Sequence, residues 1–327
     1  MKAAWYENIG PAANVLQVGD LPDPEPRAGE VRVRLHASGV NPSDVKNRAG
    51  QRGELKVPKQ IPDSDGAGVV DGVGEGVAGF SVGDRVWVYN AAFGRAFGTA
   101  AQYVCLPEVL VVPLPDMLEF AQGACLGIPA MTAHRAVFAD GPVRDQTVLV
   151  SGGAGVVGHY AIQLAKWGGA TVLTTISSAA KAEHAAGAGA DHCINYRNQN
   201  VADEAFRLTD GRGADRVIEV EGGTNLEASM AALKSDAGVV VVYGSSTGRI
   251  DMPFLGAVVR NPLLRPILVY TMSQAAKRDA QQGIEEWVKS GNAAFAIAAR
   301  FDLTEVVAAH ECVERGEKLG HVVLTID

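Results

Sequence analysis

Thr147-Val-Leu-Val-Ser-Gly-Gly-Ala-Gly-Val-Val-Gly158 is a short β-branched run that ends in three spaced glycines. A helical pattern begins directly after it. Gly153 permits a tight turn, Gly155 removes the Cβ that would hold a phosphate group away, and Gly158 lets the helix pack closely on its strand. The free N–H groups and the dipole at the start of that helix attract an anion. The stretch is therefore typical of a turn that binds the pyrophosphate of a dinucleotide.

The glycine spacing alone is weak evidence, because 38 of the 327 residues are glycine and a glycine-rich loop without a nucleotide is the alternative. The residues that follow strengthen the interpretation, because patterns typical of strands and helices alternate. The strands are expected near 170–175, 192–194, 216–220 and 239–243, and the helices near 179–188, 201–208 and 226–233. This alternation predicts an α/β fold with a doubly wound parallel sheet, a Rossmann domain.

The composition is that of a globular protein with two domains. A chain of 327 residues exceeds one ordinary core. Its 47% hydrophobic and 20% charged residues are typical of a soluble protein, and no apolar run is long enough to span a membrane. The first residues carry no secretory signal pattern. The net charge of −8 gives no basic surface, so we expect neither nucleic acid nor a membrane as a partner.

The four cysteines, Cys105, Cys125, Cys193 and Cys312, lie far apart, and none forms a Cys-x-x-Cys pair. This arrangement argues against a disulfide framework and against a structural zinc lobe. We therefore expect the protein in the reducing cytoplasm.

The beginning of the chain differs from the nucleotide fold. Val31-Arg-Val-Arg-Leu-His-Ala37 alternates apolar and polar residues, as a half-buried antiparallel strand does, and 66–76 and 79–88 add short β segments punctuated by glycine. Short strands with frequent turns predict a small barrel-like domain. The pattern becomes helical over 120–138, with a break at Pro129.

These patterns divide the chain into two domains. We predict the barrel-like domain over 1–122 and the nucleotide domain over 123–264. A helix near 274–289 and a strand near 321–326 are too little for a third core, so 265–327 is expected to complete the first domain.

The chain resembles the medium-chain dehydrogenase/reductase superfamily and, within it, the zinc-independent quinone oxidoreductase branch that includes zeta-crystallin-like enzymes. The resemblance covers nearly the full length and implies a GroES-like barrel beside the Rossmann domain. Besides the glycine turn, its carriers are Gly29-Glu-Val-Arg-Val-Arg-Leu35, Ser38-Gly-Val-Asn-Pro-Ser-Asp44, Ser64-Asp-Gly-Ala-Gly-Val-Val70, Val82-Gly-Asp-Arg-Val86, Leu126-Gly-Ile-Pro-Ala-Met-Thr-Ala133, Ser177-Ser178 with Lys181, and Gly187-Ala-Gly-Ala-Asp191.

The resemblance also indicates which branch this is. Zinc-using relatives carry a cysteine where this chain has Asn41, and Gly-His-Glu where it has Asp63-Ser-Asp65. The nitrogen and sulfur ligands that zinc prefers are therefore missing, and we expect no metal. His36, His134 and His159 are candidate ligands or bases, but we interpret them as packing residues.

The choice of cofactor depends on the end of the second strand. NAD selectivity normally requires an acidic residue about 20 positions after the turn, whereas this chain has Thr174-Thr-Ile-Ser-Ser178. By resemblance, Ser177, Lys181 and Tyr196 bind a 2′-phosphate, so we expect NADPH rather than NADH; Lys181 as a solvated residue and Tyr196 as a strand-end aromatic are the alternatives. The residues expected at the cofactor are Gly153, Ala154, Gly155, Val156, Val157, Ser177, Ser178, Lys181, Tyr196, Tyr243 and Gly244.

Catalytic roles follow from the resemblance. It implies that Asn41 and Asp44 lie at the nicotinamide end and that Thr132 offers its hydroxyl to the carboxamide. Without zinc, hydrogen-bond donors must stabilise the charge that develops on the acceptor oxygen. Structural alternatives stay open, because Asn41-Pro42 can be a turn, Asp44 a helix cap and Thr132 a hydroxyl that bonds its own helix.

The substrate pocket departs from the family pattern. Many quinone reductases place tyrosines shortly after the Asn-Pro-x-Asp stretch, whereas this chain has Lys46 and Arg52. Further candidate pocket residues are Tyr89, Asn90, Arg95 and Tyr270. The segment 89–97 is interpreted as a substrate-facing loop, with ordinary loop packing as the alternative.

The sequence therefore predicts a zinc-free, NADPH-dependent oxidoreductase that transfers a hydride to a quinone or a conjugated enone. A 2-alkenal or enoyl reductase with little quinone activity is the alternative. A non-catalytic NADPH-binding protein, crystallin-like or RNA-binding, represents another class, although the acidic charge disfavours RNA. We expect a homodimer, since the apolar run Leu263-Leu264 with Ile267-Leu-Val-Tyr270 is typical of a pairing edge; ordinary core is the other interpretation.

Overall fold

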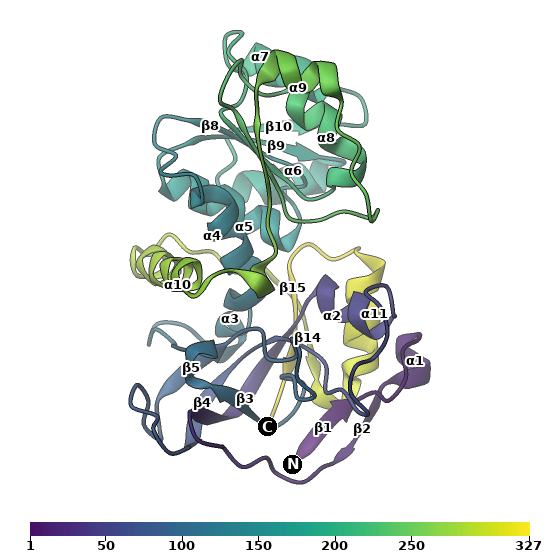
Figure 1. Ribbon diagram of the computed structural model, residues 1–327, viewed down its shortest axis with the longest axis vertical. Coiled ribbons are helices and arrows are strands. Elements are labelled where there is room, and N and C mark those ends of the chain that lie inside the picture. Colours follow the sequence, from purple (N-terminus) through teal and green to yellow (C-terminus); the bar gives the residue numbers. More distant parts are fainter. The chain divides into compact units, whose positions relative to one another are not determined.

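The computed structural model describes residues 1–327, which form two compact units (Figure 1). The first unit consists of 1–129 and 295–327, and the second of 130–294. The chain thus returns to the first unit at residue 295, whereas the sequence analysis placed the return at 265. Residues 265–294 stay with the second unit because the helix α10 (Gln274–Lys289) packs against α4 (Met131–Phe138).

A six-stranded parallel sheet forms the centre of the second unit. Its order is β10-β9-β8-β11-β12-β13. The strands are β8 (Thr147–Val150), β9 (Thr171–Ile176), β10 (His192–Asn195), β11 (Arg216–Glu219), β12 (Val239–Val242) and β13 (Leu263–Pro266). This topology confirms the predicted doubly wound fold, and its parallel strands bring their carboxyl ends to one edge.

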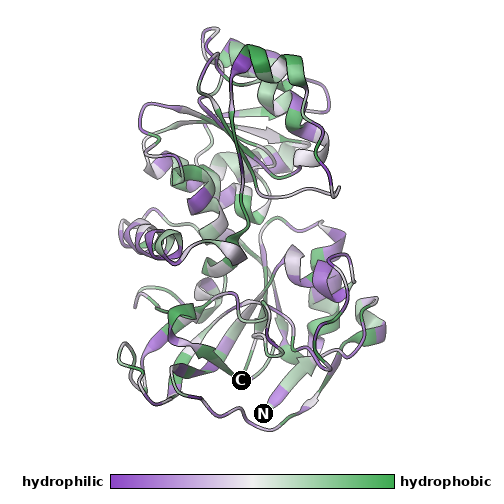
Figure 2. Cartoon of the chain, in the orientation of Figure 1, coloured by the Kyte–Doolittle hydropathy of each residue, from purple (hydrophilic) through white to green (hydrophobic).

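Helices lie before, between and after the strands of this sheet in the chain. They are α4, α5 (Val156–Trp167), α6 (Ala179–Gly187), α7 (Val201–Leu208), α8 (Gly222–Ala231), α9 (Phe254–Arg260) and α10, with a 3₁₀ turn at Val269–Thr271. The helix α9 is mostly apolar (Figure 2), yet Phe254, Leu255 and Val259 are 71%, 77% and 73% exposed. It lies in contact with α8 and leaves an apolar face open to solvent.

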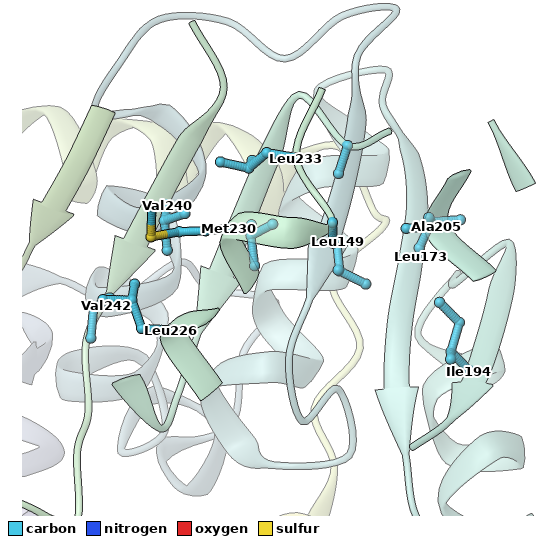
Figure 3. Close-up of a cluster of buried hydrophobic side chains, with 12 residues drawn as sticks. Leu149, Leu173, Ile194, Ala205, Leu226, Met230, Leu233, Val240 and Val242 are labelled. Carbon is cyan, nitrogen blue, oxygen red and sulfur yellow. The ribbon is translucent and has the colours of Figure 1, made fainter. Parts of the chain in front are cut away.

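The core of this unit explains why the β-branched runs form strands. Leu149, Leu173 and Ile194 on neighbouring strands belong to one buried apolar cluster with Leu226 and Met230 of α8 (Figure 3). All of these side chains are at most 2% exposed. Burying a side chain of this size contributes about 1.5–3 kcal/mol, so the apolar strands are stable only under the covering helices.

A larger, mostly antiparallel sheet forms the first unit, with the order β14-β15-β3-β4-β5-β7 and with β6 paired to β3. The strands are β3 (Glu30–Val40), β4 (Asp65–Val73), β5 (Arg85–Val88), β6 (Tyr103–Pro107), β7 (Val111–Pro113), β14 (Ile297–Asp302) and β15 (His321–Thr325), and β1 (Lys2–Trp5) pairs separately with β2 (Gln17–Asp20). As predicted, Val31, Val33 and Leu35 of β3 are buried, while Arg34 between them is exposed.

Short helices complete the first unit. They are α1 (Ala12–Val15), α2 (Pro42–Arg48), α3 (Phe120–Gly123) and α11 (Val306–Arg315), with 3₁₀ turns at Glu108–Leu110 and Leu303–Glu305. The predicted break at Pro129 lies in a π-helical turn over Leu126–Ala130, between α3 and α4. None of the helices combines the length and the apolar character needed to cross a membrane.

Candidate functional site

The glycine turn joins β8 to α5 in the second unit. Gly152 donates its N–H to Thr175 Oγ1 over 2.9 Å, which ties the turn to β9. A Cβ on Gly153 would come within 2.1 Å of Thr174 Oγ1, and one on Gly158 within 2.4 Å of Gly152 O. These two positions are closed by packing and require glycine.

Gly155 differs from the other two glycines. A Cβ there would meet only Gly152 O, at 3.3 Å, so space is open on its remaining sides. Gly155 is the N-cap of α5, and its carbonyl accepts the first helical hydrogen bond, from His159. The N–H groups of the first turn, from Val156 onward, have no helical acceptor and favour an anion. The turn thus fits a pyrophosphate at Gly155, beside Ala154, Val156 and Val157.

A buried carboxylate organises the neighbouring strand ends. Glu219, at the end of β11, is 1% exposed. It accepts hydrogen bonds from Ser151 Oγ (3.0 Å), Asn225 Nδ2 (3.1 Å), Ser229 Oγ (2.7 Å) and the N–H of Glu221 (2.7 Å). It therefore joins the residue before the glycine turn to α8. The sequence analysis missed Glu219, although an acidic residue closing an apolar strand is a recognisable signal.

The residues expected at the adenosine end come together at the carboxyl ends of β9 and β10. Ser177 is buried directly after β9, and Ser178 Oγ accepts from the N–H of Lys181 (3.4 Å) as the N-cap of α6. The Tyr196 N–H donates to Ile176 O (3.2 Å), which brings the end of β10 beside Ser177. The Tyr196 side chain is 53% exposed. The segment from Ser177 to Lys181 contains no acidic residue.

The remaining expected residues of the second unit lie after β12 and in helical segments. The Tyr243 N–H donates to Glu219 O (3.1 Å), and burial together with the Glu219 charge raises the pKa of Tyr243. A Cβ on Gly244 would come within 2.2 Å of Val220 O, so Gly244 is a close-packing position. Thr132 of α4 and Tyr270 are both 6% exposed.

In the first unit, Asn41 closes β3 and begins α2. Its N–H donates to Asp44 Oδ2 over 2.9 Å, so Asp44 caps the helix, and its side-chain Nδ2 donates to Asp65 Oδ2 over 2.7 Å. Asn41, Asp44 and Asp65 are at most 4% exposed. The amide of Asn41 is thus fixed on one side by a carboxyl group that the sequence analysis did not assign to the site.

Three buried acidic residues lie together here. Burial raises the pKa of Asp65 to about 8, while hydrogen bonds from Ile128 and Asn41 lower it and Asp63 raises it. Burial also raises the pKa of Asp44, and the charges of Asp63 and Asp65 raise it further. The surroundings therefore favour the neutral form of Asp44 and Asp65.

Asp63 has two unusual features. It adopts a left-handed backbone, with a φ of 69°, although it is fully buried. Its carboxylate accepts from Ser38 Oγ (3.2 Å) and lies 3.3 Å from His310 Nε2. Asp63 therefore connects the start of β4 to β3 and α11 rather than to Asn41.

The candidate pocket residues lie in different environments. Tyr89 is fully buried, and its hydroxyl donates to Val109 O (2.8 Å). Arg95 Nη1 donates to the carbonyls of Asn90 (3.2 Å) and Phe93, which fits the loop-packing interpretation. The side-chain amide of Asn90 is buried at a φ of 55° and has no partner. Lys46 is half-buried on α2, and Arg52 is exposed after it.

The residues at the zinc positions of metal-using relatives do not fit zinc. Asn41 offers an amide already bonded to Asp65, and no set of three or more histidine, cysteine or acidic side chains is arranged to hold a metal ion. Two of the candidate histidines lie against aromatic rings: the ring centroids of His36 and Phe120 are 4.6 Å apart, and those of His134 and Phe138 are 4.9 Å apart. All four cysteines are free.

Known proteins resemble the chain along its whole length. It matches the zinc-binding dehydrogenase family over residues 156–290 and the alcohol dehydrogenase GroES-like domain over 27–116. It is 32% identical to a quinone oxidoreductase of Mus musculus, over 98% of this chain and 96% of the relative. It is also 32% identical to a 2-haloacrylate reductase of Burkholderia, over 99% and 98% of the two chains.

Solved structures of oxidoreductases are also similar to the chain along its whole length. A structure described as an NAD-dependent alcohol dehydrogenase superposes with a TM-score of 0.91 and 32% identity, over 100% of both chains. The Escherichia coli quinone oxidoreductase in complex with NADPH superposes with a TM-score of 0.88 and 25% identity, over 99% of this chain and 100% of that one.

Asp65→Asn is expected to change how stability depends on pH. The pKa of Asp65 is about 8 in the folded state, against ~3.9 in an unfolded chain. The contribution of Asp65 to the free energy of unfolding is therefore fully present below pH ~4, where the acid is protonated in both states. It is lost as the pH rises to about 8, because the unfolded chain ionises first. Relative to wild type, the variant's free energy of unfolding should rise by on the order of 1 kcal/mol per pH unit in this window.

Urea unfolding of both proteins across this pH range measures the difference. Asp116→Asn is the matched control, because it makes the same substitution at a side chain that is 103% exposed. A difference between Asp65→Asn and wild type that stays constant with pH would contradict the raised pKa.

Proposed function

The chain belongs to the quinone oxidoreductase family of the medium-chain dehydrogenases/reductases and is an oxidoreductase, and on this premise we propose that it transfers a hydride from NADPH to quinones or conjugated enones. The observation that carries the proposal is the glycine turn, open only at Gly155 and facing the start of α5. A dinucleotide is the ligand class that this turn fits.

NADPH rather than NADH is favoured by the end of β9. Ser177, Ser178 and Lys181 offer hydroxyls and a positive charge there, and Tyr196 adds a phenol at the end of β10. A 2′-phosphate accepts from such donors, whereas the 2′-hydroxyl of NADH normally bonds an acidic residue, which is missing. The NADPH complex of the Escherichia coli relative supports the same choice. When bound, NADPH supplies the hydride and its two electrons.

Asn41, Asp44 and Thr132 are proposed at the nicotinamide end. One N–H of the Asn41 amide is used by Asp65, so its other N–H remains for a ligand. Asp44 holds the turn that presents this amide. Hydride transfer leaves a delocalised anion on the acceptor, and hydrogen-bond donors rather than a metal stabilise it.

Reduction of a carbon–carbon double bond is the second candidate. The similarity to a 2-haloacrylate reductase favours it, at an identity equal to that of the mouse quinone oxidoreductase. Lys46 and Arg52, in place of the tyrosines of many quinone reductases, also speak for a different acceptor pocket. Both reactions proceed through a delocalised anion, so the same cofactor site serves either acceptor.

A homodimer is proposed through the open edge of the parallel sheet. The strand β13 is the last in the order, and Leu263 on it is 45% exposed, while Tyr270 is buried. The apolar face of α9 is exposed in the same unit (Figure 2). An open strand edge and an exposed apolar helix are features that a second copy covers.

A cytoplasmic location is proposed from the cysteines. All four are free, and none forms a disulfide, which suits a reducing compartment.

The acceptor is identified by NADPH oxidation at ~340 nm, the absorption of the reduced nicotinamide. We expect turnover with 9,10-phenanthrenequinone or 1,4-benzoquinone after chelator treatment, and slower turnover with NADH. Turnover confined to an α,β-unsaturated aldehyde would instead select double-bond reduction. Loss of activity after chelation, or activity only with a simple ketone, would contradict the zinc-free proposal.

Lys181→Ala should weaken NADPH binding by about 1–2 kcal/mol, the loss of one charge-assisted hydrogen bond, and leave NADH nearly unchanged. Fluorescence titration with each cofactor measures both affinities. Lys234→Ala is the matched control, since Lys234 pairs with Asp215 just before β11, away from the carboxyl ends of the strands. Equal losses for NADPH and NADH would show that Lys181 does not bind a 2′-phosphate.

Leu255→Glu should shift the protein from dimer to monomer, because a charge would then enter the apolar face of α9. Light scattering coupled to size exclusion gives the mass of each variant. Met117→Glu adds the same charge at a 63% exposed residue of the first unit and should leave the dimer intact. A monomeric wild type would contradict the proposed dimer.

A further inference from the structure

The carboxyl group of Asp65 is the only side-chain partner of the Asn41 amide among the hydrogen bonds of this site. Asn41 Nδ2 lies 2.7 Å from Asp65 Oδ2, and both residues are buried. Since Asn41 is proposed to contact the cofactor or the acceptor, whatever changes Asp65 changes the group that meets the ligand. The inference developed here rests on that proposed role of Asn41.

The backbone around Asp65 prevents it from moving away. Asp65 begins β4, in register with Gly39 of β3, and Thr99 Oγ1 donates to its main-chain oxygen over 2.7 Å. Its Oδ2 also accepts the N–H of Ile128 over 2.8 Å. A Cβ on Gly127 would come within 2.0 Å of Oδ1. The carboxyl group is therefore held in one orientation, with Asn41 attached to it.

The two carboxyl oxygens of Asp65 differ in their hydrogen bonds. Oδ2 receives two N–H donors, whereas Oδ1 is buried and has no hydrogen-bond partner. A buried carboxylate with one bare oxygen is costly, and a proton on that oxygen reduces the cost. None of the ion pairs of the structure includes Asp65, so no cation neutralises it.

The charged groups facing Asp65 favour the protonated form. Asp44 from α2 and Asp63 from the segment before β4 are both acidic and buried. Behind them, His310 of α11 faces Asp63, and Arg48 of α2 pairs with Glu314. Burial dominates and brings the pKa of Asp65 to about 8. The acid is therefore mostly neutral at pH 7 and ionised at pH 9.

We propose that Asp65 is a positioning residue that fixes the Asn41 amide for hydride transfer, and that this function requires the neutral acid. A neutral acid holds the amide without adding charge. An ionised Asp65 would place a negative charge behind Asn41, in a low-dielectric surrounding, where it opposes the negative charge that forms on the acceptor. Asp65 donates no proton to the substrate in this scheme.

Asp65→Asn distinguishes the effect of ionisation from the effect of side-chain shape, because an amide resembles the neutral acid in shape and cannot ionise. For wild type, kcat/KM for the acceptor should fall about fivefold between pH ~7 and ~9, the effect of one unfavourable charge. The fall should be in kcat rather than in KM for NADPH. Asp65→Asn should retain activity and lose this inflection.

Asp63→Asn is the matched control. It is equally buried and lies two residues away, asparagine tolerates its left-handed backbone, and it does not contact Asn41. Because the Asp63 charge raises the pKa of Asp65, this variant should keep the inflection and move it to lower pH. An inflection that persists unchanged in Asp65→Asn would overturn the proposal.

A second readout needs no turnover. In the cofactor-free protein, the side-chain amide signal of Asn41, assigned by its loss in Asn41→Ala, should shift with a midpoint near the pKa of Asp65, about 8. The shift should vanish in Asp65→Asn. An amide signal that does not titrate in wild type would overturn the positioning role. A titrating amide in a protein that reduces no acceptor would instead refute the proposed function and leave the coupling between Asp65 and Asn41 established.

Discussion

The close contact between the glycine turn and its neighbouring strands is the constraint on which the nucleotide-binding unit depends. Gly153 and Gly158 are closed by Thr174 and the Gly152 carbonyl, so no side chain fits there, and the Gly152 N–H is held by Thr175 of β9. This contact brings the start of α5 to the carboxyl edge of the sheet. Gly155, the position left open, is then the place where we propose that a pyrophosphate meets the helix N-terminus.

In the first unit, strand pairing likewise brings the candidate site residues together. The register of β3 with β4 places Gly39 opposite Asp65, and the end of β3 places Asn41 beside it. Three buried acids in one region are unfavourable for stability when ionised. Hydrogen bonds from Asn41, Ile128 and Ser38 offset part of that cost. Such a cluster is typical of a functional site, where charge is placed for chemistry rather than for stability.

Much of the fold follows from local pattern. The strands β8 to β12 begin within a residue of their predicted positions, because buried parallel strands are apolar runs between turn residues. The helix α8 begins at Gly222, four residues before its predicted start at 226, because two glycines disguise its first turn. The elements β14 and α11 were not predicted at all. Their half-buried pattern is set by partners, β15 and β3, that are distant in sequence.

The candidate site was predictable from the sequence only where its residues lie close together along the chain. The glycine turn and the hydroxyls at the end of β9 are readable from spacing, whereas Asp65 and Glu219 gain their importance from partners far along the chain, such as Ile128 and Ser151. Tyr89 was predicted to line a pocket, and its hydroxyl bonds Val109 because burial of a phenol requires an acceptor.

The most direct test of the account is the affinity of Gly155→Val for NADPH, measured by fluorescence titration with circular dichroism to verify the fold. Only Gly152 O lies within 4 Å of a Cβ at this position, at 3.3 Å, so the fold should survive while the branched side chain fills the place of the pyrophosphate. We predict a folded protein that no longer binds NADPH or NADH. Retained affinity for either cofactor in the folded variant would show that the turn is not the binding site.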